Sequence, residues 1–269
     1  MEHNKRHFKA DKCLSLLEMA QLPRRVFVRQ ESMPPEHYFP AHQHPWHQLL
    51  YATSGVLTVD VVDKRLFISP EKAVWLPAGT EHSVATQYGA ELKSLYIEQN
   101  YQLLADKSQV MTMTPLIKAL IMEASEFAIE YPLDGYENEV ISLILTVLPR
   151  LETDQQHLPW PSLPELYRLC CSLYDRPGDR RTTEELANTL SMSKRTLERR
   201  FSKATGISLQ SWRNRLRFLK AVELLNSGKN ITHIALELGY SSPSAFIYMF
   251  RSQTGISPNR YLTTEQIYT

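Results

Sequence analysis

The chain has 269 residues, of which 43% are hydrophobic, 22% charged and 10% aromatic. This composition is typical of a globular protein and excludes a disordered or collagen-like chain, and the length allows one or two domains. The net charge of +1 hides an asymmetry. Residues 1–164 carry 14 Lys and Arg against 20 Asp and Glu, a net of −6, whereas residues 165–269 carry 16 against 9, a net of +7. This asymmetry suggests that the second part binds nucleic acid.

The cysteines and the N-terminal residues give no sign of export. Cys13, Cys170 and Cys171 form neither a disulfide framework nor a zinc-binding CxxC pattern. The polar, basic start of the chain lacks an apolar segment behind it, and the longest apolar run, residues 140–148, is too short to span a bilayer. We therefore expect a soluble protein of the cytoplasm.

In chain order, the first predicted elements are short strands between about residues 24 and 100. Their β-branched and aromatic segments are separated by turn signals such as Ser54-Gly55 and Pro77-Ala78-Gly79, which predicts an antiparallel barrel or sandwich. Two helices with a wide apolar face are predicted within residues 112–151. That face either packs on the barrel or forms part of a homodimer interface.

The remaining chain is predicted to be a linker followed by an all-α domain. Residues 152–164 contain three prolines and no periodicity, and the sign of the charge changes there. Beyond them, Leu197, Phe201, Gly206 and Ser208 recur 49 residues later as Phe246, Phe250, Gly255 and Ser257. The repeat predicts two helix–turn–helix units. The expected fold class is therefore α+β, divided into a barrel (1–111), a helical segment (112–151), the linker (152–164) and the helical domain (165–269).

The second helix of the first unit has the features of a DNA-recognition helix. Ser193 is a good N-cap, and a short helix with a basic outer face fits the major groove. Arg195 and Arg199 lie one turn apart and suit guanine edges, while Glu198 suits a cytosine amino group. Further contacts are expected from Thr196 and, to phosphates, from Lys194, Arg200 and Lys203.

The corresponding helix of the second unit is less basic. Ser242 caps it and Pro243 occupies its first position, where a missing N–H costs nothing. Its expected DNA-facing residues are Ser242, Ser244, Ala245, Tyr248 and Arg251. With one cation against five, this helix should contribute less affinity, and the two helices should enter the groove about 34 Å apart.

The residue pattern of the helical domain resembles the AraC/XylS family of bacterial transcription regulators over about residues 165–262. The pattern includes Leu186-Ala187, Met192-Ser193, Arg217, Ile234-Ala235, Gly239-Tyr240 and Ser257-Pro258. The resemblance implies seven helices, with two helix–turn–helix units around a shared linker helix, and double-stranded DNA and RNA polymerase as partners. Tyr248 and Leu262 stand where many members have arginine, which alters base recognition by the second unit toward an aromatic contact with a thymine methyl group.

The strand region contains a cluster of histidines in two motifs, His42-x-His44-x-x-His47-Gln48 and Pro77-x-Gly79-x-x-His82. Because side chains alternate along a strand, His42, His44 and Gln48 are expected to share one face, with His82 on a separate strand. Both motifs resemble those of the cupin barrel, with Gln48 in place of the usual glutamate and Glu71 in place of a glycine.

Three interpretations of the histidines remain open. They can line an effector pocket without a metal, formed by His42, His44, Trp46, Gln48, Tyr51 and His82. They can form a regulatory transition-metal site from His42, His44, Gln48 and His82, since imidazole suits iron, manganese or nickel. They can also be purely structural.

Taken together, the patterns predict a DNA-binding transcription regulator that senses a small molecule in its barrel, and not an enzyme. A metal-dependent cupin enzyme with a DNA-binding tail and an architectural DNA-binding protein are the alternatives. The histidine-rich Pro-Trp-His-Gln segment also resembles a subgroup encoded beside drug- or metabolite-exporter genes, one of which controls a nitroimidazole exporter. Activation or repression depends on operator position and does not follow from the residues.

Overall fold

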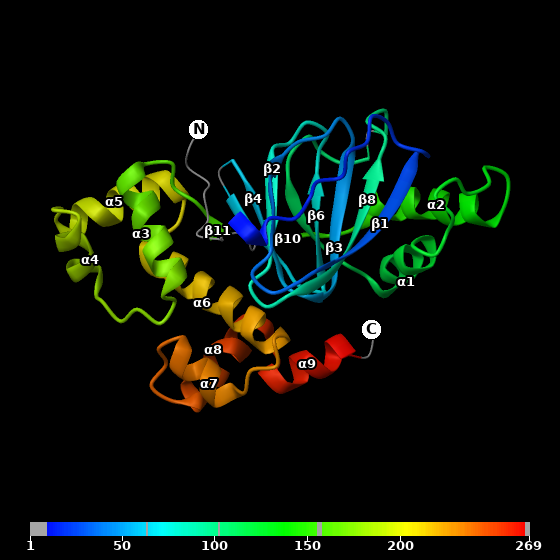
Figure 1. Cartoon of the computed structure of the whole chain (residues 1–269). Coiled ribbons are helices and arrows are strands. Elements are labelled where there is room, and N and C mark those ends of the chain that lie inside the picture. The colour runs from blue at the N-terminus through cyan, green and yellow to red at the C-terminus, as the bar shows by residue number, and fades with distance from the viewer. Residues whose placement is uncertain (1–9, 63, 102, 155–157, 267–269) are drawn as a thin grey trace. The chain divides into compact units, whose positions relative to one another are not determined.

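The computed structural model describes residues 10–62, 64–101, 103–154 and 158–266, with side chains described as far as residue 262 (Figure 1). The chain forms two compact units, and the division falls between residues 157 and 158, inside the predicted linker. Residues 63–65 group with the second unit. The linker contains two short strands, and the first helix of the second unit begins at Pro164.

The strands form two sheets, and all of them except β11 and the start of β5 belong to the first unit. One has the order β1-β8-β3-β6-β9-β10, with β1 at Val26–Met33, β3 at His47–Gly55, β6 at Lys72–Leu76, β8 at Ala90–Ile97, β9 at Gln109–Thr112 and β10 at Thr153–Asp154. The other has the order β11-β5-β4-β7-β2, with β2 at Tyr38–His42, β4 at Leu57–Val61, β5 at Lys64–Ile68, β7 at His82–Ala85 and β11 at Leu158–Pro159. A short 3-10 helix, η1, occupies Ala10–Lys12. Antiparallel pairing, as between β1 and β8 or β3 and β6, confirms the predicted antiparallel architecture.

The alternation of side chains along β3 creates two separate cores. Leu50 faces the other sheet and packs with residues such as Leu57 and Val84. Leu49 and Tyr51 point to the opposite side, where they pack against two helices. The same pleat therefore supplies an inner core between the sheets and an outer core beneath the helices.

The two helices of the first unit cover the outer face of the six-stranded sheet (Figure 1). They are α1 (Pro115–Ala124), which Thr114 caps, and α2 (Tyr136–Val147), which continues into the 3-10 helix η2 (Leu148–Arg150). Ile117 and Ile144 are fully buried against the sheet. Lys118 forms an ion pair with Glu71 at 2.6 Å beside β6. The apolar face of these helices thus packs on the barrel.

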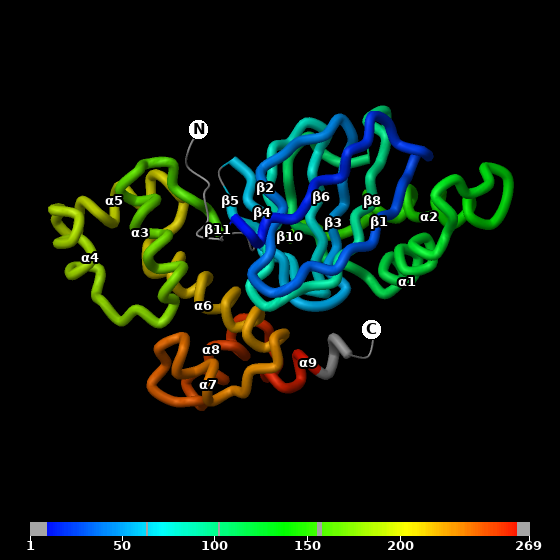
Figure 2. Tube along the Cα trace, viewed as in Figure 1, coloured from blue at the N-terminus to red at the C-terminus, as the bar shows by residue number. Residues whose placement is uncertain are grey.

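The second unit is all helical apart from β11. Its helices are α3 (Pro164–Asp175), α4 (Thr183–Thr189), α5 (Lys194–Thr205), α6 (Leu209–Asn226), α7 (Ile231–Glu237), α8 (Pro243–Thr254) and α9 (Pro258–Gln266). Figure 2 shows the pairs α4–α5 and α7–α8 at opposite ends of α6. These seven described helices match the architecture expected from the family resemblance.

The internal repeat extends to individual hydrogen bonds. In both helix–turn–helix pairs, α4–α5 and α7–α8, a serine caps the second helix by accepting from the backbone N–H three residues later. These serines are Ser193 and Ser242. Both helices end at a glycine, Gly206 or Gly255, with φ of +77°. This left-handed conformation is one that glycine adopts without steric cost, which explains its recurrence.

None of the helices in the described part of the chain combines the length and apolar character needed to cross a bilayer.

Candidate functional site

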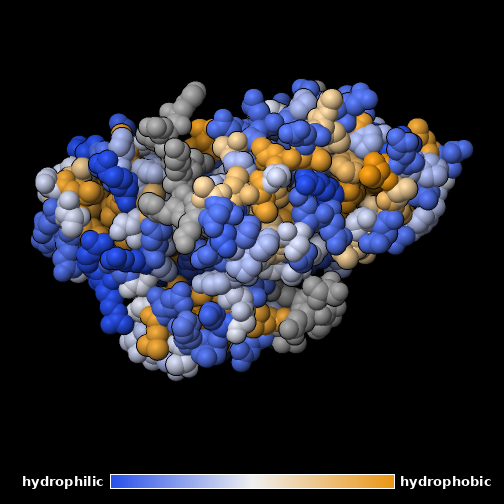
Figure 3. All heavy atoms as spheres, in the orientation of Figure 1, coloured by the Kyte–Doolittle hydropathy of each residue, from blue (hydrophilic) through white to orange (hydrophobic). Residues whose placement is uncertain are grey.

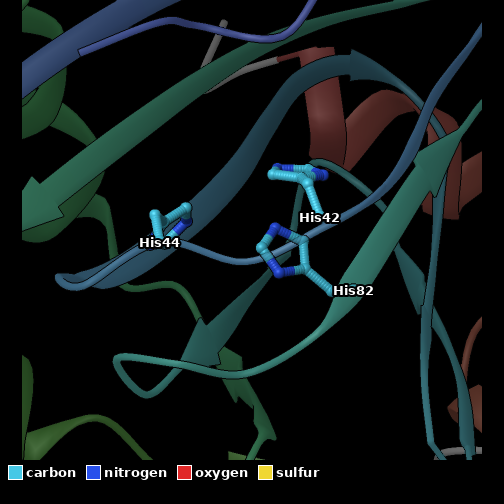
Figure 4. A group of neighbouring side chains, drawn as sticks. All are labelled: His42, His44 and His82. Atoms are coloured by element: carbon cyan, nitrogen blue, oxygen red, sulfur yellow. The ribbon is translucent and has the colours of Figure 1, made fainter. Parts of the chain in front are cut away.

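Three histidine rings lie close together in the first unit (Figure 4). His42 ends β2 and pairs in register with His82, the first residue of β7, and their ring centroids lie 4.3 Å apart. His44 lies in the bend between β2 and β3, and its ring centroid is 5.3 Å from that of His82. The candidate ligand atoms of the three side chains all lie within 4.8 Å of one another.

A tight turn brings the second histidine motif to the first. The N–H of Gly79 donates to the carbonyl of His44 at 2.9 Å, and the N–H of Ala78 donates to His47 Nδ1 at 3.1 Å. Gly79 has a φ of +76°, a conformation that favours glycine. Docking of this turn places His82 beside His42 and His44.

The expectation that His42, His44 and Gln48 share one face of one strand is wrong. His42 belongs to β2, His44 to a bend, and Gln48 to β3 of the other sheet. They come together because the chain crosses from one sheet to the other between them. His82 lies on a separate strand after a Pro-Gly turn, as predicted.

A cavity of about 100 Å³ adjoins the histidines and is lined by Trp46 and Gln48 as well as by the three rings. Phe39, Leu50, Val84 and Leu92 form apolar walls, and Arg29, Glu31, Ser94 and Tyr96 add polar groups. Tyr51 does not belong to it. Its position, three residues after Gln48, places its side chain on the opposite face of β3, in the core under α1 and α2.

Backbone carbonyls lie beside one nitrogen of each histidine. Nδ1 of His42, His44 and His82 lies 2.8, 2.8 and 2.9 Å from the carbonyl oxygens of Pro40, Trp46 and Thr80. A carbonyl oxygen only accepts, so Nδ1 carries the hydrogen in His42 and His82, and these neutral rings keep the lone pair on Nε2. His44 has an acceptor oxygen beside each nitrogen, that of Trp46 at Nδ1 and that of Gln48 at Nε2. Burial lowers the pKa of all three side chains, that of His82 to about 3, so the rings are neutral near pH 7.

Two buried polar atoms at the cavity have no hydrogen-bond partner among the described residues. They are His82 Nε2, an acceptor in this tautomer, and Trp46 Nε1, a donor. Gln48 donates from its amide nitrogen to Ser94 Oγ at 2.9 Å, and its oxygen lies 3.1 Å from His44 Nε2. Leaving a buried polar atom unpaired costs about 1–3 kcal/mol, so these atoms indicate a site prepared for a ligand.

The second candidate site is the outer surface of α5. Lys194, Arg195, Glu198, Arg199 and Lys203 are exposed, whereas Leu197 and Phe201 are fully buried. The structure therefore presents five of the predicted contact residues on one surface.

Two predicted residues of α5 have internal partners. The guanidinium of Arg200 forms an ion pair with Glu165 of α3 and faces the thioether of Met192. These internal partners compete with the predicted contact to a phosphate. Thr196 is half-buried, and its hydroxyl bonds to that of Ser193 at 2.9 Å.

A basic hollow beside α4 and the start of α5 was missed by the sequence analysis. It is lined by Arg180, Arg181, Thr182, Thr183, Glu184, Lys194, Gln210, Arg213 and Arg217. Arg213 donates to the carbonyl of Arg181 at 2.7 Å, and Arg217 donates to that of Pro177 at 3.0 Å, so α6 holds the loop before α4. In Figure 3, strongly hydrophilic residues gather beside α4. The adjacent arginines 180 and 181, just before the capping box, were the available sequence signal.

On α8 the exposed predicted residues are Ser244, Tyr248 and Arg251, while Ser242 and Ala245 are half-buried. Tyr248 is 79% exposed. An aromatic side chain this exposed on the second helix of a helix–turn–helix unit suits an apolar contact with a base.

Comparison with known proteins identifies both units. Residues 26–128 match the AraC-like ligand binding domain, and residues 186–264 match a helix-turn-helix domain. The HTH-type transcriptional regulator NimR of Escherichia coli K12 is 31% identical over 223 residues, 83% of this chain and 82% of NimR. The chain belongs to the AraC/XylS family of transcriptional regulators.

Two further proteins are similar to this chain. The transcriptional activator RhaS of Escherichia coli O6:H1 is 29% identical over 194 residues, 72% of this chain and 66% of RhaS. Among solved structures, ToxT of Vibrio cholerae matches 89% of this chain and 98% of its own, with 14% identity and a TM-score of 0.37.

Proposed function

We propose that this AraC/XylS-type regulator binds promoter DNA through α5 and α8 and responds to a small molecule held in the histidine-lined cavity. The observation that supports DNA binding is the exposed basic face of α5, whose opposite face is anchored in the core by the buried Leu197 and Phe201. The protein acts in the cytoplasm, where the chromosome is accessible, and catalyses no reaction.

The two recognition helices contribute unequally to DNA binding. On α5, Arg195, Glu198 and Arg199 contact base edges, and Lys194 and Lys203 contact phosphates. The basic hollow beside α4 adds further phosphate contacts. On α8, Ser244, Ala245 and Tyr248 contact bases and Arg251 a phosphate. Most of the electrostatic affinity for DNA therefore comes from the first helix–turn–helix pair, α4–α5.

The effector is a small molecule with both polar and apolar surface. The cavity of about 100 Å³ offers apolar walls, the unpaired N–H of Trp46 and the unpaired Nε2 of His82. A ligand that satisfies both atoms gains hydrogen bonds that the protein alone lacks. The resemblance of the Pro-Trp-His-Gln segment to regulators encoded beside exporter genes suggests exporter genes near the regulator's own gene as the targets.

The active form is a homodimer that pairs through exposed apolar residues of α1 and α2. Leu116, Met122 and Leu143 are 52%, 46% and 43% exposed. Two copies on adjacent half-sites bind more tightly than one, because the second contact becomes intramolecular.

A mobility-shift and footprinting experiment on the DNA upstream of the regulator's own and neighbouring genes tests the proposal. The wild type should protect a defined site at physiological salt, and Arg195→Ala with Arg199→Ala should abolish protection. Arg168→Ala, an exposed arginine on α3, is the matched control and should bind normally. Absence of a protected site, or equal binding by the double variant, would refute the proposal.

A further inference from the structure

We propose that His42, His44 and His82 bind a divalent transition-metal ion, such as Zn²⁺, Ni²⁺ or Fe²⁺, at the wall of the sensor cavity. The three side chains come from β2, the bend after it and β7, and their candidate ligand atoms lie within 4.8 Å of one another. Figure 4 shows the rings gathered around a common space.

The first line of support is the orientation of the imidazoles. Nδ1 of each ring lies beside a backbone carbonyl oxygen, at 2.8, 2.8 and 2.9 Å, and His42 and His82 donate Nδ1–H there. A metal-binding histidine almost always donates its other ring N–H in this way, which fixes the tautomer and the ring plane. The arrangement therefore leaves the Nε2 lone pairs of His42 and His82 in one place, and His44 offers a third nitrogen once the oxygen of Gln48 rotates away from its Nε2.

His47, a nearby histidine of the same unit, differs from the cluster in its hydrogen bonds and has a structural role. His47 accepts from the N–H of Ala78 at Nδ1 and, with Nε2 3.3 Å from the carbonyl of Gln99, donates there. Both of its nitrogens are satisfied by the protein. His82 is 1% exposed and its Nε2 has no partner in the described part of the chain. That contrast separates a structural imidazole from one prepared for a ligand.

The ligand set narrows the class of metal. The described cluster contains only histidines, with neither a carboxylate nor a thiolate. Imidazole suits zinc, copper, iron and nickel, whereas magnesium and calcium prefer oxygen ligands. Three protein ligands also leave a coordination position open, as in catalytic rather than structural zinc sites.

The histidines line the cavity, so a bound metal would take the lone pair of His82 Nε2 and leave the effector the N–H of Trp46 and the open coordination position of the metal. Arg29 and Glu31, an ion pair at 2.5 Å, line the same cavity together with Ser94 and Tyr96. The amide oxygen of Gln48 lies 3.1 Å from His44 Nε2, close enough to act as a further neutral ligand after a small rotation. The metal site itself does not depend on DNA binding, but any role of the metal in regulation rests on the proposed function.

Metal titration of the full-length protein, purified without a histidine tag and stripped with a chelator, tests the site. Co²⁺ is the spectroscopic probe, and Zn²⁺ and Ni²⁺ are titrated calorimetrically. We expect one equivalent to bind, with Co²⁺ developing visible absorption bands. Loss of groups that only support a ligand already costs about 10–100-fold in metal affinity, so His42→Ala and His44→Ala should each lose more than about tenfold.

Three controls make the result decisive. His37→Ala removes a histidine with the same Nδ1 bond to a carbonyl, that of Pro35, outside the cluster, and should bind metal normally. A variant with His3→Ala and His7→Ala should also bind normally. Because His82 is deeply buried, His82→Gln is first compared with wild type by thermal melting, and His42→Ala carries the conclusion if that variant is unfolded.

Equal metal affinity in wild type and in the His42→Ala and His44→Ala variants would overturn the metal site. So would the lack of stoichiometric binding at micromolar protein. Mobility shifts with and without chelator, run in parallel, distinguish this failure from that of the proposed function. If the wild type binds DNA, the arginine variants do not, and no metal binds, the proposed function would stand and the metal site would be refuted.

Discussion

His42 and His82 occupy opposite positions in the ladder between β2 and β7, with their ring centroids 4.3 Å apart. The pair connects two motifs that are 40 residues apart in the chain. A register shift in β2 between Phe39 and His42 accompanies this pairing, and bulges of this kind re-aim side chains near functional sites. The geometry of the histidine cluster therefore depends on the backbone conformation of β2.

Gly79→Ala should destabilise the protein by about 1–2 kcal/mol, the cost of a left-handed conformation for a residue with a Cβ. The added Cβ would meet no atom within 4 Å, so backbone conformation alone is responsible. Urea denaturation gives the free energy of unfolding. Gly79→Asn should recover part of the loss, because asparagine tolerates this conformation. Equal losses in both variants would indicate that backbone conformation is not the cause.

Arg199→Ala should weaken specific DNA binding by about 1–3 kcal/mol and relax specificity at one base pair. Lys203→Ala should weaken binding to all sequences evenly and reduce the slope of log affinity against log salt by about 1. Titrations against specific and scrambled DNA at several salt concentrations separate the two effects. A change of specificity in Lys203→Ala would reverse their assigned roles.

Tyr248→Ala should reduce affinity for the specific site while leaving the salt dependence unchanged, because the side chain is exposed and uncharged. Tyr248→Phe retains the apolar ring and serves as the control. If the contact is with a thymine methyl group, replacing that thymine by uracil should weaken wild-type binding but not binding by Tyr248→Ala.

Asp179 should stabilise the loop before α4 at neutral pH and lose this effect in acid. Its carboxylate accepts from the backbone N–H of Arg181 at 2.8 Å and from Arg181 Nη2 at 2.6 Å, and these bonds lower the pKa of Asp179. With the folded-state pKa below the unfolded one, the stabilisation is complete above the ordinary pKa of an aspartate, about 4, and disappears as pH falls through the folded value.

Denaturation of wild type and Asp179→Asn at pH 7 and at pH 3 tests this. The variant should be less stable than wild type at pH 7, and the difference should shrink at pH 3. Asp134→Asn, in the loop before α2, is the control for the loss of one exposed carboxylate outside this loop. A difference that grows in acid would contradict the assignment.

Leu143→Glu should weaken the proposed homodimer, because it places a charge on the exposed apolar part of α2. Leu133 is 60% exposed in the loop between α1 and α2, so Leu133→Glu is the matched control. Sedimentation equilibrium gives the dissociation constant of each variant. Equal constants would place the interface elsewhere.

Much of the proposed DNA-binding surface follows from local sequence patterns. Ser193 and Thr182 are caps, Gly206 ends α5, and Leu197 and Phe201 lie four residues apart on its buried face. Each of these signals acts within a few residues, so the helix and its exposed cations were predictable without long-range information. The antiparallel sheets were predictable for a similar reason, from strand and turn signals.

The tertiary structure alone decided which predicted residues work together. Arg200 looked like its neighbours on α5, but packing of α3 pairs it with Glu165. Tyr51 follows the histidine motif closely, yet the pleat of β3 turns it into the core beneath α1 and α2.

The histidine site shows the same division between sequence and structure. The sequence by itself determined that histidines are concentrated in two motifs, but it could not tell His47, whose two nitrogens are satisfied, from His82, whose Nε2 is not. That difference arises from hydrogen bonds between segments far apart in the chain. Their geometry depends on how two sheets and a turn pack together, which periodicity and spacing do not encode.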